Sequence, residues 1–419
     1  MTELDAVIVG AGQAGLGVSY FLQRDGRKHV VFERGRIGES WISQRWDSFR
    51  LNTPNFMNVL PGLPYDGPEP DGFWSRDEYV AYLRSYVDHW RLPVRTGATV
   101  VSVEQAQGEG RFTVRTTTGG QAEEPVSSRS IVIASGSQRT QKLPPTRDRL
   151  PRDILQLHTG DYRSPAALPP GAVLVVGSAQ SGCQIAEELL LSGRTVYLST
   201  SKVGRVPRRY RGRDILEWWI DSKFLDVTYA SLEDKSIVRA PQPQASGIGR
   251  YGHTLSLQHL ARQGAVILGR LLDVNAGTLI LGDDAAANVR YADGFSLRQK
   301  DGIDAYLARA GITPPPLEED PADAPDPEAA CVSPLRRLGL GDAKVSTVIW
   351  ATGFGGDFSW IHVPAFDAEG KPHHQQGVAP VPGLYFIGFP WLRSRKSGII
   401  YGVEDDAQFI AAALAKQLG

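Results

Sequence analysis

Short apolar runs alternate with amphipathic stretches near the start of the chain, which predicts strands joined by helices. The run Ala6-Val-Ile-Val ends at a glycine-rich turn, and Leu16, Val18, Phe21 and Leu22 then follow with helical spacing. A second apolar run, His29-Val-Val-Phe32, ends at Glu33. The order strand, turn, helix, strand is typical of the beginning of a parallel α/β unit.

The turn after the first predicted strand reads Gly10-Ala-Gly-Gln-Ala-Gly15, which has the spacing G-x-G-x-x-G. Glycines at these positions permit a tight turn, a close approach of a pyrophosphate to the backbone, and close packing of the helix on the sheet. The phosphate then lies at the positive end of the helix. Glu33 stands where a carboxylate can accept hydrogen bonds from a ribose diol. The residues expected to bind this first dinucleotide are Gly10, Gly12, Gln13, Ala14, Gly15 and Glu33.

A second copy of this pattern begins at the apolar run Ala172-Val-Leu-Val-Val and continues as Gly177-Ser-Ala-Gln-Ser-Gly182. Ala179 replaces the middle glycine, which leaves less room for a pyrophosphate. The residues expected to bind a second dinucleotide here are Gly177, Ser178, Gln180, Ser181 and Gly182.

The next strand of the second copy ends without a carboxylate. Thr200, Ser201 and Lys202 stand at its end, and five arginines follow between positions 205 and 213. A carboxylate would repel a 2′-phosphate, whereas hydroxyls and cations bind one, so these residues favour NADPH over NADH. The arginines have two interpretations that remain open here, a solvated surface loop and a docking site for the phosphate.

Two dinucleotide units in one chain favour FAD in the first, where Glu33 meets its ribose, and a nicotinamide nucleotide in the second. We therefore predict an α/β fold with two Rossmann-like dinucleotide-binding domains, for FAD and NADP, the second inserted into the first. The FAD-binding domain is expected to span 1–165 and 346–419, and the NADP-binding domain 166–345. Apolar runs at 131–136 and 347–353 end in small residues and mark the two crossings between the domains.

Helices are also expected over 76–90, 293–310 and 405–418, and strands over 93–103 and 111–116. Long loops are expected at 35–70 and at 313–330, the latter rich in proline and acidic residues. Loops and strand ends of this kind supply further expected cofactor contacts. These are Arg34, Ser40, Trp41, Trp46, Thr53, Val100, Ala134, Ser135, Gly136, Ala351, Thr352, Gly353, Gly388 and Gly398.

Composition narrows the class of protein. The 419 residues carry 45 Lys and Arg against 46 Asp and Glu, a formal net charge of −1, which gives no reason to expect a nucleic-acid or membrane partner. The only two cysteines, Cys183 and Cys331, form no C-x-x-C pair, which argues against a redox dithiol. No apolar run is long enough to cross a membrane and the N-terminus lacks a basic signal-peptide region, so a cytoplasmic enzyme is expected. A homodimer is left open.

Two further motifs point to a known family. Leu157-His158-Thr-Gly-Asp-Tyr162 precedes the second glycine turn, and Ala351-Thr-Gly-Phe354 follows the second domain. Together with the two turns, they resemble the class B flavin-dependent monooxygenases, which include flavin-containing monooxygenases, plant YUCCA-type enzymes and related bacterial flavoproteins. The family hallmark F-x-G-x-x-x-H is incomplete, because Arg152 and Ile154 stand at its Phe and Gly positions.

The resemblance implies a reaction. NADPH reduces FAD, O₂ then gives a C4a-(hydro)peroxyflavin, and this species oxygenates a small organic substrate at nitrogen or sulfur or in a YUCCA-like oxidation. The resemblance also assigns Asn52 to the position beside the flavin as the catalytic residue, where a carboxamide can hydrogen-bond the flavin and a developing peroxide without titrating. A Baeyer–Villiger reaction is the alternative, although Tyr162-Arg163 replaces the Trp-Pro or Asp-Pro of those enzymes.

Other interpretations stay open. The chain could be a reductase that passes electrons from a pyridine nucleotide through the flavin, an oxidase that uses FAD alone, or a degenerate nucleotide sensor. No metal is expected, because the adjacent His373 and His374 lie in a polar stretch. Cys183 is either a thiolate activated by a helix N-terminus or a small packed side chain. The basic residues Arg393, Arg395 and Lys396 leave an anionic substrate open.

Overall fold

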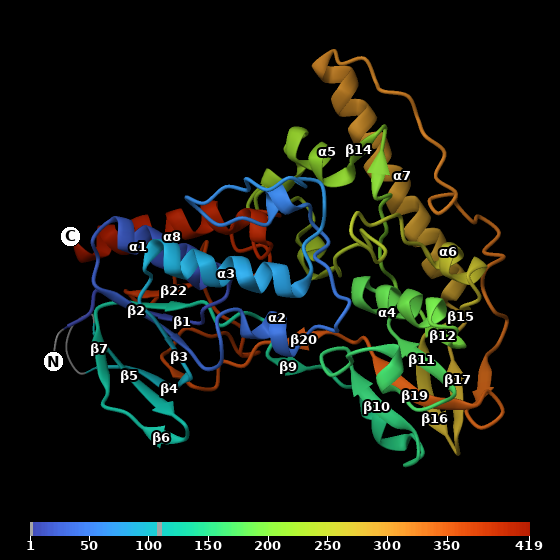
Figure 1. The fold of residues 1–419 in the computed structure, drawn as a ribbon, viewed down its shortest axis with the longest axis horizontal. Coiled ribbons are helices and arrows are strands. Elements are labelled where there is room, and N and C mark those ends of the chain that lie inside the picture. Colours follow the sequence, from blue (N-terminus) through green and yellow to red (C-terminus); the bar gives the residue numbers. More distant parts are fainter. Residues whose placement is uncertain (1–2, 107–110) are drawn as a thin grey trace.

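Two parallel sheets, each with its own helices, form the body of the molecule (Figure 1). The computed structural model describes residues 3–106 and 111–419. The expectation about a signal peptide partly concerns residues 1–2, which lie outside these ranges. The helices are α1 (Gln13–Arg24), α2 (Glu39–Ser43), α3 (Arg76–Trp90), α4 (Gln180–Leu191), α5 (Ile215–Asp221), α6 (Leu257–Arg262), α7 (Ala285–Ala310) and α8 (Val403–Leu418).

The first sheet contains the N-terminal nucleotide unit. Its strands are β1 (Ala6–Val9), β2 (His29–Glu33), β3 (Val94–Thr96), β8 (Ile131–Ile133) and β22 (Leu384–Phe386). All pair in parallel, in the order β22-β8-β1-β2-β3. The central strand β1 is fully buried, which explains its continuous apolar sequence. Helices α1, α3 and α8 lie together on one side of this sheet (Figure 1).

The second sheet repeats this arrangement. Its strands are β10 (Leu155–His158), β11 (Ala172–Val176), β12 (Val196–Ser199), β15 (Val266–Leu268) and β19 (Val345–Trp350). They are parallel in the order β10-β19-β11-β12-β15. The sheet therefore draws on residues 155–350, a wider range than the expected 166–345, because β10 and β19 both pair within it.

The chain crosses between the two sheets twice, and the two crossings are bonded to each other. After β8 the chain forms β9 (Thr140–Gln141) and enters the second sheet, and after β19 it forms β20 (Phe354–Gly355) on its return. Strands β9 and β20 pair antiparallel. The predicted insertion of one dinucleotide-binding fold into the other is thus confirmed.

Two further sheets complete the fold, one of them mixed and the other antiparallel. One contains β4 (Ala98–Gln105), β5 (Phe112–Thr118), β6 (Gln121–Ala122), β7 (Val126–Ser128) and β21 (Ile361–His362), and the other β16 (Leu271–Asn275), β17 (Thr278–Leu281) and β18 (Arg337–Gly339). The pair β13 (Arg209–Tyr210) and β14 (Arg213–Asp214) is a short hairpin. The single strand predicted over 93–103 is wrong: Gly97, at φ +71°, turns the chain so that β3 and β4 join different sheets.

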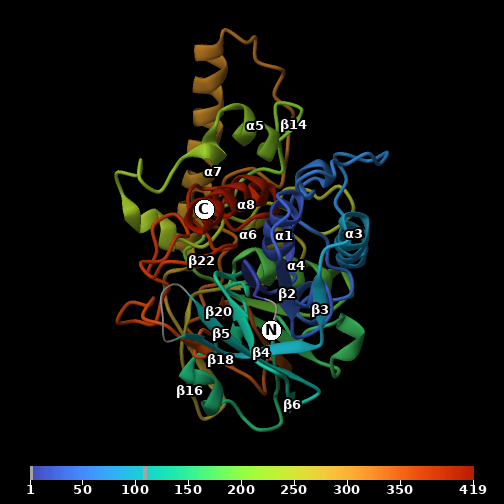
Figure 2. The ribbon, with the colours of Figure 1, turned by 90° about the vertical axis from the view of Figure 1, so that its left-hand side faces the viewer.

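Helix α3 begins and ends as predicted, but α7 begins at Ala285 rather than at 293. Its extra turns are helical because Ala285, Val289 and Ala292 continue the buried face. Figure 2 shows α7 projecting from the body, with the chain returning beside it; the segment 313–330 contains no helix or strand, as predicted. Within 3–106 and 111–419, no helix combines the length and apolar character that a bilayer span requires.

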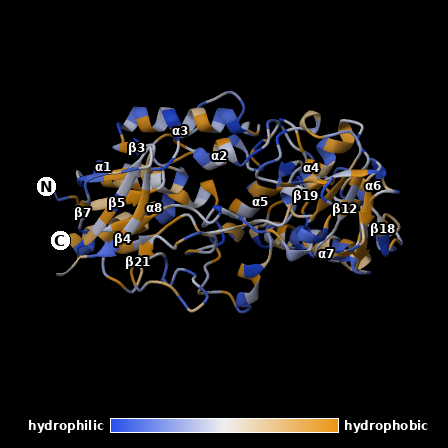
Figure 3. Ribbon diagram, turned by 90° about the horizontal axis from the view of Figure 1, so that it is seen from below, coloured by the Kyte–Doolittle hydropathy of each residue, from blue (hydrophilic) through white to orange (hydrophobic). Residues whose placement is uncertain are grey.

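Apolar residues gather on the strands at both ends of the molecule (Figure 3). The largest buried cluster extends from the first sheet through α1 and α8 into α4 and α6 of the second unit. One continuous core therefore joins the two nucleotide units, and their relative position does not depend on the crossing strands alone.

Both glycine turns depend on contacts that exclude side chains. Gly10 and Gly177 share φ +110°, and a Cβ atom would lie 2.6 Å from the Ala134 carbonyl oxygen in the first case and 2.5 Å from that of Ala351 in the second. A Cβ at Gly15 would collide with the carbonyl oxygen of Gly10. These backbone contacts bring each helix N-terminus against the end of its sheet.

Replacement of Gly15 by alanine should therefore destabilise the first unit. We expect Gly15→Ala to lower the free energy of unfolding by about 3 kcal/mol, since the added methyl group overlaps rigid backbone. Chemical denaturation of the apoprotein measures this change. Gly302→Ala is the matched control, because Gly302 also lies in a helix but has open space around it; it should stabilise slightly. Equal stability of the two variants would contradict the packing argument.

Candidate dinucleotide and substrate site

A single cavity of about 460 Å³ lies between the two nucleotide units. The first unit contributes the turn around Gly12, and the second contributes Gln180 and Ser181. Eighteen of the residues expected from sequence line it. They are Gly10, Gly12, Gln13, Ala14, Glu33, Arg34, Ser40, Trp41, Asn52, Thr53, Val100, Ala134, Ser135, Gly136, Gln180, Ser181, Gly388 and Gly398.

Two helix N-termini border this cavity without side-chain caps. Helix α1 begins after Gly12 and α4 begins after Ala179, and neither cap residue makes a side-chain hydrogen bond. The first N–H groups of a helix need acceptors and carry partial positive charge, so each end is suited to a phosphate. A Cβ at Gly12 would have nothing within 4 Å, which leaves room for a pyrophosphate against the backbone. The arrangement fits two dinucleotides.

Glu33 lies at the end of β2 and lines the cavity. Its carboxylate oxygens accept hydrogen bonds from the backbone N–H groups of Ala11 and Gly35, each at 2.9 Å. The side chain is buried. These bonds fix its orientation while leaving acceptor capacity on both oxygens for a ribose diol.

Among the described residues, Arg45 of the cavity wall has no carboxylate partner, and one side-chain oxygen each of Ser135 and Gln44 has no hydrogen-bond partner. Arg45 donates only to the Gln44 carbonyl and to Gln138, and no carboxylate pairs with it. Burial lowers the pKa of Arg45 to about 10, so it remains charged at neutral pH. The side-chain oxygens of Ser135 and Gln44 are buried without partners. A bound dinucleotide supplies both an anion for Arg45 and polar atoms for these oxygens.

The cavity also contains residues that the sequence did not indicate. They are Val9, Phe32, Glu39, Gln44, Arg45, Phe49, Leu51, Ala98, Thr99, Ser137, Gln138, Arg139, Trp360, Pro390, Ile399 and Ile400. Many lie in loops, where no periodicity distinguishes a residue that faces a cavity from one that faces solvent. Three of them had a signal in the sequence: Phe49 is an aromatic residue near Trp41 and Trp46, and Ile399 and Ile400 lie in the glycine-bounded run 398–402.

Asn52 lies where the two units meet. Its side-chain oxygen accepts a hydrogen bond from Gln184 of α4 at 3.1 Å, and its backbone oxygen accepts one from Arg208 at 2.9 Å. Asn52 lines the cavity, and its amide nitrogen donates no hydrogen bond among the described residues. The contact between the two units orients the carboxamide.

The other expected residues are not part of the cavity lining. Trp46 is buried against Phe49 and Tyr162. The hydroxyl of Thr200 is buried and donates to the Leu268 carbonyl. The expected residues that do not line the cavity are Gly15, Trp46, Gly177, Ser178, Gly182, Thr200, Ser201, Lys202, Ala351, Thr352 and Gly353.

Four of the five arginines in this cluster pair with carboxylates, whereas Arg209 is exposed and donates to the Tyr251 carbonyl. Arg205 and Arg208 are each 1% exposed. Arg205 pairs with Asp293 and Asp323, and Arg208 pairs with Asp214. Arg211 and Arg213 also bind carboxylates, those of Asp304 and of Glu217 and Asp221. Asp293, Asp323 and Asp304 are distant in sequence from their partners, so the sequence could not show that Arg205 and Arg211 are neutralised; Asp214, Glu217 and Asp221 lie close to theirs along the chain. Lys202 is exposed near Tyr291 and has no carboxylate partner among the described residues.

The motif from His158 to Tyr162 joins the crossings to α4. His158 donates through Nε2 to the Gly353 carbonyl at 3.0 Å and accepts through Nδ1 from Gly160. Burial lowers the pKa of His158, so the ring is neutral at neutral pH. Asp161 accepts from Gln141, and the Tyr162 hydroxyl donates to Glu188 at 2.7 Å. The motif therefore bonds the two crossings to α4, and its histidine and tyrosine are buried.

Two further alternatives are resolved by burial. Cys183 is fully buried and donates to the Ser178 carbonyl, and burial raises the pKa of its thiol, so it is a packed side chain and not a reactive thiolate.

Lys396 pairs with Asp226 and Asp405. Arg395 lies between Phe224 and Trp391 and does not line the cavity. No anionic subsite follows from these basic residues.

Residues 7–238 match the family model described as pyridine nucleotide-disulphide oxidoreductase, and the chain belongs to this family of enzymes. Among individual proteins, it is 31% identical to an uncharacterized CzcO-like oxidoreductase of Geobacillus kaustophilus over 97% of both chains. It is 28% identical to a probable indole-3-pyruvate monooxygenase, YUCCA3 of Arabidopsis thaliana, over 59% of this chain and 57% of that protein.

Solved structures show the same fold. A variant of the flavin monooxygenase from Stenotrophomonas maltophilia superimposes with a TM-score of 0.66 over the whole of both chains, at 19% identity. A bacillithiol disulfide reductase from Bacillus cereus superimposes with a TM-score of 0.62 over 99% of both, at 16% identity. The expected resemblance to flavin-dependent monooxygenases is confirmed.

The open space at Gly12 gives a test of dinucleotide binding. We expect Gly12→Ala to weaken FAD binding at least about tenfold, because its methyl group occupies the space of the pyrophosphate. The flavin content of the purified protein and a titration of the apoprotein with FAD measure this. The stability of the apoprotein should stay within about 0.5 kcal/mol of the wild type, since the methyl group meets no protein atom. Unchanged FAD affinity would exclude the pyrophosphate from this turn.

Proposed function

We propose that the protein is an NADPH- and FAD-dependent monooxygenase that uses O₂ to oxygenate a small organic substrate. FAD binds the N-terminal unit and NADPH the inserted unit. The expected reaction is oxygenation at nitrogen or sulfur, or a YUCCA-like oxidation. Baeyer–Villiger oxygenation is the second candidate within the same chemistry.

One observation carries this proposal: the uncapped N-termini of α1 and α4 border the same cavity. A phosphate at each end directs two dinucleotides toward one space, as hydride transfer between them requires. When bound, FAD accepts hydride from NADPH and delivers electrons to O₂, which supplies the oxygen atom for the substrate. The YUCCA3 relative is a probable monooxygenase by its description, which supports the same chemistry.

The residues of the chain bind, orient and exclude water. Glu33 is placed for the ribose of FAD, and Arg45, which has no carboxylate partner within the described residues, is suited to an anionic group of a dinucleotide. Trp41, Phe49 and Trp360 give the wall apolar surface that limits water. Ser201 and Lys202 at the end of β12 are the groups left for a 2′-phosphate, because Thr200 is buried. Asn52, oriented by Gln184, is placed to donate its amide N–H into the cavity.

The disulfide reductases that share the fold act through different chemistry. Cys183 is buried in α4, and neither Cys183 nor Cys331 lines the cavity. The chain therefore offers no thiol for electron transfer to a disulfide. A flavin reductase without oxygen insertion is separated from the proposal by the experiment that follows.

Anaerobic reduction followed by O₂ tests the proposal. The FAD-loaded protein is mixed without oxygen with NADPH or with NADH, O₂ is then admitted, and flavin absorbance is followed. We expect faster reduction by NADPH, and then a long-lived absorbance distinct from that of oxidised or reduced flavin, because the buried wall excludes water. Immediate reoxidation with stoichiometric H₂O₂ would overturn the monooxygenase assignment. Failure of both nucleotides to reduce the flavin would favour the oxidase or the sensor.

Asn52→Ala tests the catalytic assignment in the same assay. We expect the oxygen-reactive species to decay at least about tenfold faster and H₂O₂ release to rise, because the amide donor to the flavin is lost. Gln184→Ala is the control, since it removes the same hydrogen bond between the domains without a change in the cavity wall. If the oxygen-reactive species decays at the same rate in Asn52→Ala as in the wild type, Asn52 has only a structural role. The same conclusion follows if Asn52→Ala and Gln184→Ala accelerate its decay equally.

A further inference from the structure

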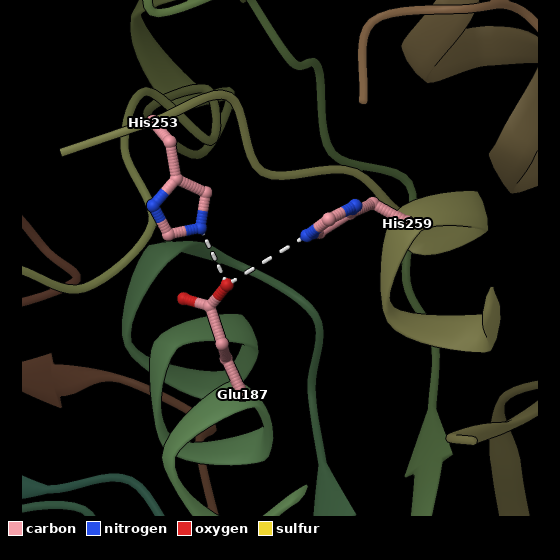
Figure 4. A group of neighbouring side chains, drawn as sticks. All are labelled: Glu187, His253 and His259. Carbon is pink, nitrogen blue, oxygen red and sulfur yellow. Dashed lines mark hydrogen bonds and ion pairs between the residues drawn. The ribbon is translucent and has the colours of Figure 1, made fainter. Parts of the chain in front are cut away.

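Three side chains that could bind a metal converge beside α4, outside the cavity (Figure 4). Glu187 belongs to α4, His253 to the loop before α6, and His259 to α6 itself. The carboxylate oxygen Oε1 of Glu187 lies 2.6 Å from Nε2 of His253 and 4.0 Å from Nε2 of His259. The three atoms all lie within 4.8 Å of one another. Figure 4 shows both rings directed toward the carboxylate.

The carboxylate is held in place by the surrounding backbone. Glu187 is 1% exposed, and its second oxygen, Oε2, accepts the backbone N–H of Ile248 at 2.8 Å. This bond leaves Oε1 directed between the two imidazoles. Bonds of this kind behind a ligand are typical of metal sites, because they fix the orientation of the ligand before an ion binds.

The loop that carries His253 is shaped around its ring. A Cβ at Gly247 would overlap the imidazole, so the ring packs directly on the glycine backbone. Gly247 also donates its N–H to the carbonyl oxygen of His253 at 2.7 Å. The first turn of α4 holds the preceding residues, since Gln180 accepts from the N–H groups of Ala245 and Ser246. The position of His253 is therefore determined by the fold and not by an exposed, freely rotating loop.

His259 presents a lone pair to the cluster. Its Nε2 lies 2.9 Å from the side-chain nitrogen of Gln263, which can only donate. Nε2 is therefore the acceptor nitrogen of the ring, and this is the form in which imidazole binds a metal. Gln263 is exposed at the end of α6, so its side chain can turn away when an ion binds.

We propose that Glu187, His253 and His259 bind one divalent transition-metal ion, with Zn²⁺ as the best match. Two imidazole nitrogens and one carboxylate oxygen suit Zn²⁺, whereas Mg²⁺ and Ca²⁺ prefer oxygen ligands alone. In a tetrahedral shell with bonds of about 2.0–2.1 Å, neighbouring ligand atoms lie about 3.3 Å apart. The two observed distances, 2.6 and 4.0 Å, lie on either side of this value. Shifts of less than about 1 Å in the two rings complete the geometry.

The ion would tie three elements together without entering the reaction cavity. Gln180 and Ser181 at the start of α4 line the cavity, and Glu187 lies further along the same helix. A metal at Glu187 therefore connects α4 to the loop before α6 and to α6. We assign it a role in holding the inserted unit together, independent of the proposed oxygenase reaction. Water completes the four-coordinate shell.

Equilibrium dialysis of the full-length, chelator-treated protein against Zn²⁺ tests this site. We expect one equivalent of zinc in the wild type and an affinity at least about 100-fold lower in His253→Ala and in His259→Ala, since each loses a direct ligand. Titration with Co²⁺ should give the intense visible absorption of a tetrahedral ion in the wild type only. His373→Ala is the matched control: it removes one histidine of the exposed adjacent pair and should bind zinc as the wild type does.

Three variants are used, so that the metal-site proposal can still be refuted if one of them does not fold. The side chains of His253 and His259 are 42% and 24% exposed, so their removal should leave the fold intact, which circular dichroism verifies. Glu187→Gln keeps the shape of the buried side chain as a third variant. Zinc binding well below one equivalent in the wild type, or equal affinity in the wild type and the double variant His253→Ala/His259→Ala, would overturn the proposal. Either result leaves the oxygenase proposal untouched.

Discussion

The close contact between a glycine turn and the end of a neighbouring strand is the constraint on which the rest of the structure depends. Gly10 approaches Ala134 and Gly177 approaches Ala351 so closely that no side chain fits between them. Each contact presses a helix N-terminus against the end of its sheet, where its free N–H groups meet the cavity. Both units therefore present a phosphate site by means of backbone geometry alone.

The second consequence is that the two units share one cavity. The antiparallel pair β9–β20 binds the outgoing and returning crossings together, and one apolar core extends from α1 into α4. The surviving end of the family hallmark strengthens this junction, since His158, Asp161 and Tyr162 bond to the crossings and to α4. A motif that sequence comparison associates with catalysis thus acts here as a set of structural bonds. Under the proposed function, the reaction depends on the cofactors, on Asn52 and on the apolar wall.

Local patterns predicted the elements that local physics controls. The G-x-G-x-x-G turn, Glu33 at a strand end and the helix over 76–90 all follow from spacing and propensity within a short window, and all were predicted correctly. The prediction over 93–103 was wrong because one glycine turns the strand into another sheet, a choice made by distant pairing partners. The cluster of Glu187, His253 and His259 was missed for a similar reason, since its members come together only when α4 and α6 pack.

The sequence by itself determined the class of fold, the two nucleotide turns, their order along the chain and the absence of a C-x-x-C dithiol. These properties depend on residues close together in sequence, where glycine, apolar periodicity and a strand-end carboxylate act directly on the backbone. Only the tertiary structure determined which charged side chains have an oppositely charged partner. Arg205 and Arg208 are neutralised by buried aspartates, whereas Arg45 has no carboxylate partner within the described residues. A charged side chain interacts with whichever groups the fold brings near it. These groups cannot be identified from the spacing of residues along the chain.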